Sequence, residues 1–263
     1  MKTALTIAGS DCSGGAGIQG DLKTFDAHGV YGMSVITAVT AQNTTKVSYI
    51  QGLEPITITK QLEAIFDDIK VDSIKIGMLF NKRIVTAIVN TFEQYNLPKI
   101  VLDPVMISTT GRILLKGDAI ESIVTDMFPL CNLITPNILE AERLTDTAIS
   151  NTDDMETACK KLYELGPKNI LVKGGHLRDT ACDVLFDGSK FTYYNHQRID
   201  NPNTHGTGCA LSSAIAANIS KGQNTTDAVK LAKNYITKAI AGGFSIGSGD
   251  GPVNHFIEGN YYE

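Results

Sequence analysis

The stretch ALTIAGSDCSGGAGIQGD, residues 4–21, decides the fold class of this chain. Its first part, Ala4–Ala8, is a short apolar run of the length expected for a buried strand. A glycine-rich loop follows, in which small residues allow backbone to approach a ligand at the start of a helix. The loop lacks the Lys-Ser/Thr pair of a P-loop and does not match the dinucleotide fingerprint. On its own it fits a tight turn and a ligand-binding loop equally well.

Outward from this stretch, short apolar runs rich in β-branched residues alternate with segments of helical periodicity. The predicted strands are Ala4–Ala8, Val35–Thr40, Ser73–Gly77, Lys99–Leu102, Leu133–Thr135 and Asn169–Lys173. Two helical faces are marked by Ile58, Leu62, Ile65, Phe66 and Ile69, and by Ile84, Val85, Ile88 and Phe92. This alternation predicts an α/β fold, in which a mostly parallel central sheet is covered by helices on both faces.

One segment departs from the alternation. Asp183–Phe186, an Asp187-Gly188 turn and Lys190–Tyr194 predict a β-hairpin that lies antiparallel at a sheet edge. Two helices are expected after it, at about Thr207–Ser220 and Thr225–Ala241. Because no repeat, low-complexity tract or linker is visible, we expect residues 1–263 to form a single domain.

The composition restricts the class of partner. Of 263 residues, 43% are hydrophobic and 19% charged, as in ordinary globular proteins. The net charge of -5 provides no basic surface for nucleic acid or anionic membrane. Five cysteines form no CxxC pair, which indicates reduced thiols and not a disulfide framework or zinc site. The first apolar run is too short for a signal peptide or a membrane span. We therefore expect a cytoplasmic protein without nucleic-acid or membrane partners.

Polar residues follow two of the predicted strands directly. Asp103 comes after Lys99–Leu102, and Asn137 with Glu140 comes after Leu133–Thr135. Ligands of open α/β sheets bind beyond the carboxyl ends of the strands. There, two carboxylates and an amide can hold Mg²⁺ through water while phosphates fill its other positions. Asn137 also fits a helix N-cap and Asp103 a turn residue, but their shared sheet edge favours a functional site.

Two lysines suit a phosphate group. Lys173 emerges from a predicted buried strand beside two glycines, although a solvated strand-end lysine would look the same. Lys233 falls within the apolar stripe of the last helix, which contains Val229, Ala232, Ile236 and Ile240. A lysine on a core face must snorkel or find an anion, and a nucleotide phosphate would satisfy it.

A third site-like segment opens the first C-terminal helix. Gly206, Thr207 and Gly208 leave backbone N–H groups at a helix start, where the macrodipole also favours negative charge, so they predict an anion hole. Cys209 lies in the first turn, where a thiolate is favoured, although a buried inert thiol is the alternative. His205 fits a capping or packing role as well as a functional one.

In this order, these segments resemble the ribokinase superfamily, and within it the hydroxymethylpyrimidine/phosphomethylpyrimidine kinases of thiamine biosynthesis. The resemblance spans nearly the whole chain. The segments that carry it are Gly9-Ser10-Asp11, Gly14-Gly15-Ala16-Gly17-Ile18-Gln19, Tyr31-Gly32-Met33, Ala41-Gln42-Asn43, Lys75-Ile76-Gly77-Met78, Asp103-Pro104-Val105-Met106, Thr135-Pro136-Asn137 with Glu140-Ala141, Lys173-Gly174-Gly175-His176 and Thr204 through Cys209.

The resemblance implies a ribokinase-like fold, usually assembled as a homodimer, and an enzyme that uses ATP and Mg²⁺. It implies phosphorylation of 4-amino-5-hydroxymethyl-2-methylpyrimidine and then of its monophosphate. Carried over by position, the family's pattern implies that Gln42 hydrogen-bonds the pyrimidine edge. The other implied roles are pocket lining for Ala16, Asp21 and Met78, metal binding for Asp103 and Glu140, phosphate binding for Asn137, Lys173 and Lys233, an anion hole at Gly206, Thr207 and Gly208, and catalysis at Cys209, where sugar kinases of the superfamily carry an aspartate.

The chain departs from the family at two places. The segment Ile107–Gly111 lacks a lysine that many members carry near position 109, and Thr40 stands where an apolar pocket residue is common. Neither departure touches the expected phosphate site.

Two other functions compete with the pyrimidine kinase. A pyridoxal kinase on the same scaffold also phosphorylates a hydroxymethyl group on a heteroaromatic ring. Some pyridoxal-preferring relatives carry a second cysteine in the flap, which Ile107–Gly111 lacks. A non-catalytic ligand sensor is the other competitor, and the intact Asp103, Glu140, Lys173 and Cys209 argue against it.

Overall fold

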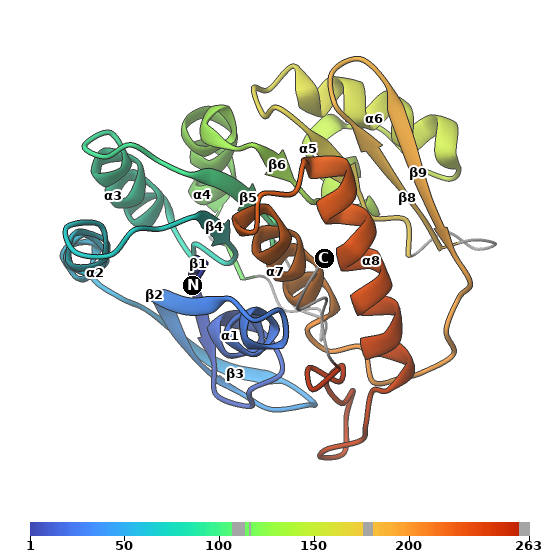
Figure 1. Ribbon diagram of the computed structural model, residues 1–263, viewed down its shortest axis with the longest axis horizontal. Coiled ribbons are helices and arrows are strands. Elements are labelled where there is room, and N and C mark those ends of the chain that lie inside the picture. Colours follow the sequence, from blue (N-terminus) through green and yellow to red (C-terminus); the bar gives the residue numbers. More distant parts are fainter. Residues whose placement is uncertain (107–113, 116, 176–180, 258–263) are drawn as a thin grey trace.

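One nine-stranded sheet runs through the computed structural model, which describes residues 1–106, 114–115, 117–175 and 181–257 (Figure 1). The strand order is β3-β2-β1-β4-β5-β6-β7-β8-β9. The six strands from β2 to β7 in this order are parallel, and β3, β8 and β9 are antiparallel to their neighbours. The strands are β1 Thr3–Asp11, β2 Tyr31–Gln42, β3 Val47–Gly52, β4 Ser73–Ile76, β5 Lys99–Leu102, β6 Leu133–Ile134, β7 Ile170–Val172, β8 Ala181–Phe186 and β9 Phe191–His196.

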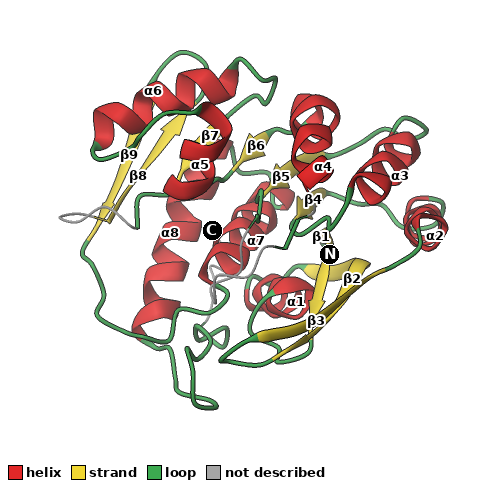
Figure 2. Cartoon of the chain, turned by 180° about the vertical axis from the view of Figure 1, so that it is seen from behind, coloured by secondary structure: helices red, strands yellow, loops and turns green. Residues whose placement is uncertain are grey.

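Helices cover both faces of this sheet. Figure 1 looks onto the face covered by α1, α7 and α8, and Figure 2 onto the face covered by α2 to α6. The α-helices are α1 Gly17–Ala27, α2 Pro55–Phe66, α3 Lys82–Phe92, α4 Gly117–Ser122, α5 Ile138–Thr145, α6 Thr152–Tyr163, α7 Thr207–Ser220 and α8 Thr225–Ala241. The prediction of an α/β class, a mostly parallel sheet and an edge hairpin is confirmed.

Alternating side chains along the strands build two separate cores. Leu5 and Ile7 of β1 belong to the core under α2 to α6, whereas Ala4 faces the core under α1, α7 and α8. This follows from the period of two along a strand. Helix α7 packs against α1, α8 and the strands β1, β4 and β5. Its small residues, among them Ala210 and Ala214, are fully buried and let it lie close to the sheet.

The sequence analysis did not predict β3, and it started β2 four residues late. Strand β3 lies at the sheet edge with mostly exposed or half-exposed side chains, so it has no apolar run to mark it. The first residues of β2, Tyr31–Ser34, include a glycine and a serine, yet they pair in register with Thr3–Thr6. Pairing with a central strand therefore extends β2 beyond its apolar segment.

A buried ion pair joins the sheet to the helices on the face covered by α1, α7 and α8. The Lys75 Nζ of β4 lies 2.9 and 2.8 Å from the two carboxylate oxygens of Asp21 in α1, and neither side chain is exposed. The hydroxyls of Thr6 and Ser213 donate to the same carboxylate at 2.6 and 2.8 Å. Burial opposes the charge on Lys75, but Asp21 outweighs it and raises the lysine pKa above its ordinary value. The carboxylate thus ties β1, β4, α1 and α7 together.

We expect Lys75→Met to destabilise the fold by about 3–5 kcal/mol, because it leaves the Asp21 carboxylate buried without a counter-charge. Urea unfolding followed by circular dichroism measures the change. The matched control is Lys70→Met, which removes an exposed lysine 3.4 Å from Asp72. We expect this control to stay within about 0.5 kcal/mol of the wild type. Equal effects of the two substitutions would contradict the structural role of the buried pair.

Candidate functional site

A cleft of about 1040 Å³ lies at the carboxyl ends of the parallel strands, where α7 begins. It is the place where an open α/β sheet binds its ligands. The sequence-predicted residues that line it are Ala16, Gln42, Met78, Asp103, Asn137, Glu140, Lys173, Gly206, Thr207, Gly208, Cys209 and Lys233. Residues from six loops, three helices and the end of strand β2 therefore meet at one site.

Asp21, which was expected to line the pocket, lies behind the cleft wall. Its side chain is fully buried and occupied by Lys75, Thr6 and Ser213. Lys75 itself reaches the lining of the cleft, so Asp21 acts on the site through this lysine. Apolar spacing along α1 could place Asp21 on a buried face, but its partner comes from β4 and is distant in sequence.

A lysine and two carboxylates gather after β5, β6 and β7. Lys173 Nζ lies 2.6 Å from Asp103 Oδ1, and the Thr135 hydroxyl donates to the same oxygen at 3.2 Å. Burial opposes the charge on Lys173, but Asp103 and Glu140 outweigh it and raise the lysine pKa. Burial raises the pKa of Glu140 to about 7, against the opposing effect of Lys173. Additional positive charge in the cleft would stabilise this carboxylate.

Asn137 and Glu140 form a capping box at the start of α5. Asn137 Oδ1 accepts the Glu140 N–H at 2.9 Å, and Glu140 Oε2 accepts the Asn137 N–H at 2.9 Å. The other oxygen of Glu140 accepts the Met106 N–H at 3.3 Å. Asn137 therefore caps a helix, as one of the two sequence interpretations had it. The box also fixes the Glu140 carboxylate at the cleft with lone pairs still available.

The carboxylates fit a hydrated cation better than a closed metal cage. Among the residues that the structure describes, no group of three or more His, Cys, Asp or Glu side chains converges on a point. Asp103 and Glu140 are the two carboxylates of the cleft that could hold Mg²⁺, an ion that keeps several waters and shares phosphate oxygens. Burial and the nearby charge of Asp103 raise the pKa of Glu140, so a cation beside these two carboxylates would stabilise the ionised form of Glu140.

The start of α7 is shaped by glycine. Gly206 has φ 84°, and a Cβ there would lie 1.9 Å from the Gly15 carbonyl oxygen, so only glycine fits. A Cβ at Gly208 would approach Asp103 Oδ2 and Lys173 Nζ at 3.2 and 3.4 Å, which brings this helix start against the charged group. The Thr207 N–H already donates to the Thr204 carbonyl at 3.1 Å. The N–H groups of Gly206, Gly208 and Cys209 remain as candidate donors for the predicted anion hole.

Cys209 holds a neutral thiol in this state. Burial raises the pKa of the thiol to about 11. The charges of Asp21 and Asp103 act in the same direction, and together with burial they outweigh the opposing effect of Lys75. Burial and the two carboxylates therefore oppose the thiolate that the helix start was expected to favour. Part of the side chain still faces the cleft.

Lys233 forms an ion pair with a carboxylate of the protein, that of Asp183. Its Nζ lies 2.8 Å from Asp183 Oδ2, and Asp183 Oδ1 accepts the Gly174 N–H at 2.9 Å. Asp183 begins the predicted hairpin, and nothing in the sequence links it to α8. The lysine lines the cleft, so it can serve a phosphate while it stays anchored to Asp183.

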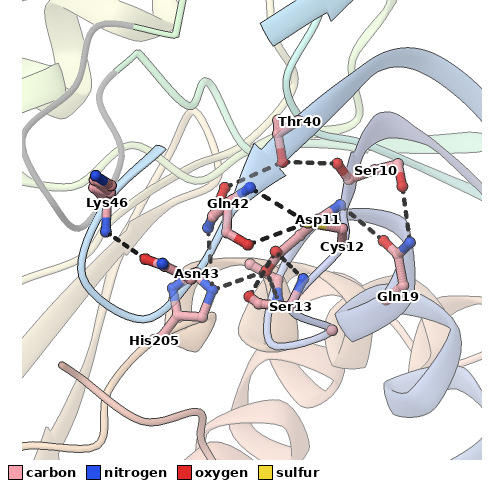
Figure 3. A network of polar contacts seen from close by, with 12 residues as sticks. Ser10, Asp11, Cys12, Ser13, Gln19, Thr40, Gln42, Asn43, Lys46 and His205 are labelled. Carbon is pink, nitrogen blue, oxygen red and sulfur yellow. Dashed lines mark hydrogen bonds and ion pairs between the residues drawn. The ribbon is translucent and has the colours of Figure 1, made fainter. Parts of the chain in front are cut away.

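A hydrogen-bond network closes the other end of the cleft (Figure 3). Asp11, the last residue of β1, accepts the Ala16 N–H at 2.9 Å and lies 2.9 Å from His205 Nε2. His205 Nε2 is in turn 3.3 Å from the Gln42 amide nitrogen. Burial opposes ionisation of Asp11, but hydrogen bonds from His205 and Ser13 outweigh it and lower its pKa to about 2. The sequence analysis gave Asp11 no role, although its position three residues after the predicted strand Ala4–Ala8 was a usable signal.

Some expectations concern residues outside the described part of the chain. The segment Ile107–Gly111 and His176 belong to the ranges 107–113 and 176–180, so the family differences expected there stay predictions.

Comparisons with known proteins identify the family of this chain. The family model for phosphomethylpyrimidine kinase matches residues 11–254. The chain belongs to the phosphomethylpyrimidine kinase family. It is 47% identical over 256 residues to the thiamine biosynthesis bifunctional protein ThiED of Geobacter sulfurreducens, covering 97% of this chain and 52% of that protein. The chain thus spans about half the length of this bifunctional relative.

Solved structures of a phosphomethylpyrimidine kinase and of a pyridoxal kinase share the fold. The crystal structure of phosphomethylpyrimidine kinase from Clostridium difficile is 48% identical with a TM-score of 0.82, covering 91% of this chain and 100% of that one. An ADP complex of Bacillus subtilis pyridoxal kinase is 38% identical with a TM-score of 0.90, and 97% of each chain is covered. The chain is therefore a kinase with a ribokinase-like fold. None of the helices described here is both long and apolar enough to cross a membrane.

Proposed function

We propose that this kinase transfers phosphate from ATP to 4-amino-5-hydroxymethyl-2-methylpyrimidine and then to the resulting monophosphate. The observation that carries the proposal is one cleft lined both by Gln42 and by the group of Asp103, Lys173 and the α7 start. This reaction needs two parts. One is an amide that hydrogen-bonds the edge of the substrate ring, and the other is a positively charged helix start that holds the transferred phosphoryl group. Family membership and the similarity to a phosphomethylpyrimidine kinase structure support it.

The chain's own groups can position the phosphates. Lys173 and the N–H groups of Gly208 and Cys209 would neutralise charge on the transferred phosphoryl, as a preorganised anion hole does. Lys233, anchored on Asp183, would contact the nucleotide phosphates. Asp103 and Glu140, with Asn137 fixing Glu140, would hold Mg²⁺, which supplies charge neutralisation at the phosphates. Similarity to a kinase whose structure contains ADP supports ATP as the donor.

Cys209, in its thiolate form, would accept the proton of the substrate hydroxyl and become a neutral thiol. Phosphoryl transfer has a loose transition state, so the proton can leave late and no strong base is needed at the start. The second phosphorylation begins from a phosphate that is already ionised, and it should depend less on the thiol. We also propose a homodimer in the cytoplasm, which rests on the family resemblance.

The second candidate is a pyridoxal kinase, favoured by the ADP-bound pyridoxal kinase structure with its TM-score of 0.90. Its substrate also carries a hydroxymethyl group on a heteroaromatic ring. An assay that offers hydroxymethylpyrimidine and pyridoxal side by side, with products followed by mass, separates the two. We expect the monophosphate and then the pyrophosphate of the pyrimidine. Phosphorylation of pyridoxal alone would overturn the first assignment.

We expect Gln42→Leu to weaken selection of the pyrimidine by about 1–3 kcal/mol, because ring groups lose their partner at a half-buried position. The measurement is kcat/KM for hydroxymethylpyrimidine. ATP binding, measured by calorimetry, should not change, since the side chain of Gln42 contacts Thr40 and His205 and not Lys173 or Asp103. Wild-type kcat/KM in the variant would show that Gln42 does not read the ring.

A further inference from the structure

The hydrogen bonds around Gln42 fit one orientation of its side-chain amide better than the other. Asp11 is buried and ionised, and its oxygens accept the N–H groups of Ser13 and Ala16 and the Ser13 hydroxyl. A carboxylate can only accept, so His205 Nε2, 2.9 Å from Asp11 Oδ2, must carry a proton and donate it. This holds whether or not the other ring nitrogen is also protonated.

A donating His205 Nε2 cannot accept from the Gln42 amide nitrogen 3.3 Å away. The conflict disappears when the two ends of the Gln42 amide are exchanged. Its oxygen then shares the His205 proton with Asp11. Its nitrogen faces Thr40 Oγ1, 3.4 Å from that end of the amide, and Thr40 is free to accept because its own proton goes to the Ser10 carbonyl at 3.0 Å. Figure 3 shows the three groups around the amide.

The frame around this amide is rigid. A Cβ at Gly15 would lie 2.4 Å from His205 Cδ2, so the glycine-rich loop is in contact with the ring. The His205 backbone donates to Gly251 and accepts from Val253, both at 3.1 Å. Thr40 is 6% exposed on β2. The His205 ring and the Thr40 oxygen are therefore held in place, so the amide has to adapt to the proton that His205 donates to Asp11.

We propose that the Asp11–His205 pair on one side and Thr40 on the other fix the orientation of the Gln42 amide, and so set which ring edge the enzyme accepts. The proposal rests on the function proposed above. Fixed in this way, the amide offers the cleft one carbonyl lone pair beside His205 and one N–H beside Thr40. His205 and Asp11 are positioning residues, since neither needs to touch the substrate.

This polarity matches an aminopyrimidine. The amino group neighbours the hydroxymethyl group on the ring, and His205 directly precedes the anion hole. The amide oxygen beside His205 then meets the amino group, and the amide N–H meets the adjacent ring nitrogen. A pyrimidinone with a carbonyl and a ring N–H in these places presents the reverse pattern, so acceptor would face acceptor and donor would face donor. Mismatched buried polar groups are strongly rejected.

The test compares two substrates in each variant: 4-amino-5-hydroxymethyl-2-methylpyrimidine and its 4-oxo counterpart. We expect the wild type to prefer the amino compound strongly. In His205→Leu the amide can turn, so we expect KM for the amino compound to rise by about tenfold and the amino/oxo ratio of kcat/KM to fall by about tenfold or more. A purely structural effect would lower both substrates equally and leave the ratio unchanged. His205→Gln, which restores an N–H donor near the Nε2 position, should return the ratio towards the wild-type value.

Thr40→Val is the second variant, because it removes the other contact while keeping the shape of a strand residue. We expect it to lower the ratio in the same direction, so the proposal stays testable if His205→Leu does not fold. The matched control is Ser48→Ala, an exposed hydroxyl that donates to the Ala41 carbonyl, with no expected change. An unchanged ratio in folded His205→Leu or in Thr40→Val would overturn the proposal. Failure of the wild type to phosphorylate the amino compound would instead overturn the proposed function.

Discussion

Removal of divalent cations with excess EDTA will abolish turnover, and Glu140→Gln will lower kcat by about tenfold or more. The reason is the charge at the ends of β5 and β6. Asp103 and Glu140 line the cleft together, and burial raises the pKa of Glu140 to about 7, so the pair requires additional positive charge. Glutamine at position 140 has the shape of glutamate and can still accept the Asn137 N–H at the start of α5, but it removes the negative charge of the Glu140 carboxylate. Steady-state assays with titrated Mg²⁺ measure both effects.

The control for Glu140→Gln is Glu164→Gln, which neutralises an exposed carboxylate at the end of α6. We expect wild-type kcat and wild-type Mg²⁺ dependence for this control. The Glu140 variant should also need a higher Mg²⁺ concentration for half-maximal rate. Full activity in EDTA would remove the metal from the scheme, and an unchanged metal requirement in Glu140→Gln would remove this carboxylate from the metal site.

Much of the fold was predictable because the buried strands of a parallel sheet are continuous apolar runs. Strand ends could then be located, and Asp103, Asn137 and Lys173 follow them directly, so their meeting at one edge was predictable as well. The edge strand β3 was missed because its side chains are mostly exposed and carry no apolar period. Hydrophobic patterns in a sequence identify buried segments, whereas an edge strand such as β3 is held mainly by backbone hydrogen bonds and leaves no such pattern.

The partners of buried charges were not predictable from local sequence. Lys233 was correctly placed on a core face, but its anion is Asp183 from β8, and Asp21 is neutralised by Lys75 from β4. Each pair joins elements more than 45 positions apart, so spacing within one element cannot reveal it. The ionisation of Cys209 was not predictable for a related reason. The helix start favours a thiolate locally, whereas burial near carboxylates that are distant in sequence raises the pKa of the thiol to about 11.

The raised pKa of Cys209 gives its role a direct kinetic signature. We expect Cys209→Ala to slow the first phosphorylation by about 10²-fold or more, the scale of general base assistance, and to slow the second phosphorylation less. The variant keeps the backbone N–H groups of Gly208 and residue 209, so the anion hole remains. Single-turnover measurements of each step, starting from the alcohol and from the monophosphate, separate the two effects.

The pH dependence follows from the same value. With a thiol pKa of about 11, only a small fraction is thiolate at neutral pH, and this fraction grows about tenfold per pH unit below the pKa. The first step of the wild type should therefore accelerate as pH rises from 7 to about 9, whereas the second step, which starts from a phosphate with a pKa of about 6, should stay nearly flat. Cys209→Ala should lose the rise in the first step. A folded Cys209→Ala enzyme that runs both steps at wild-type rates with the same pH profile would make the thiol a packing residue.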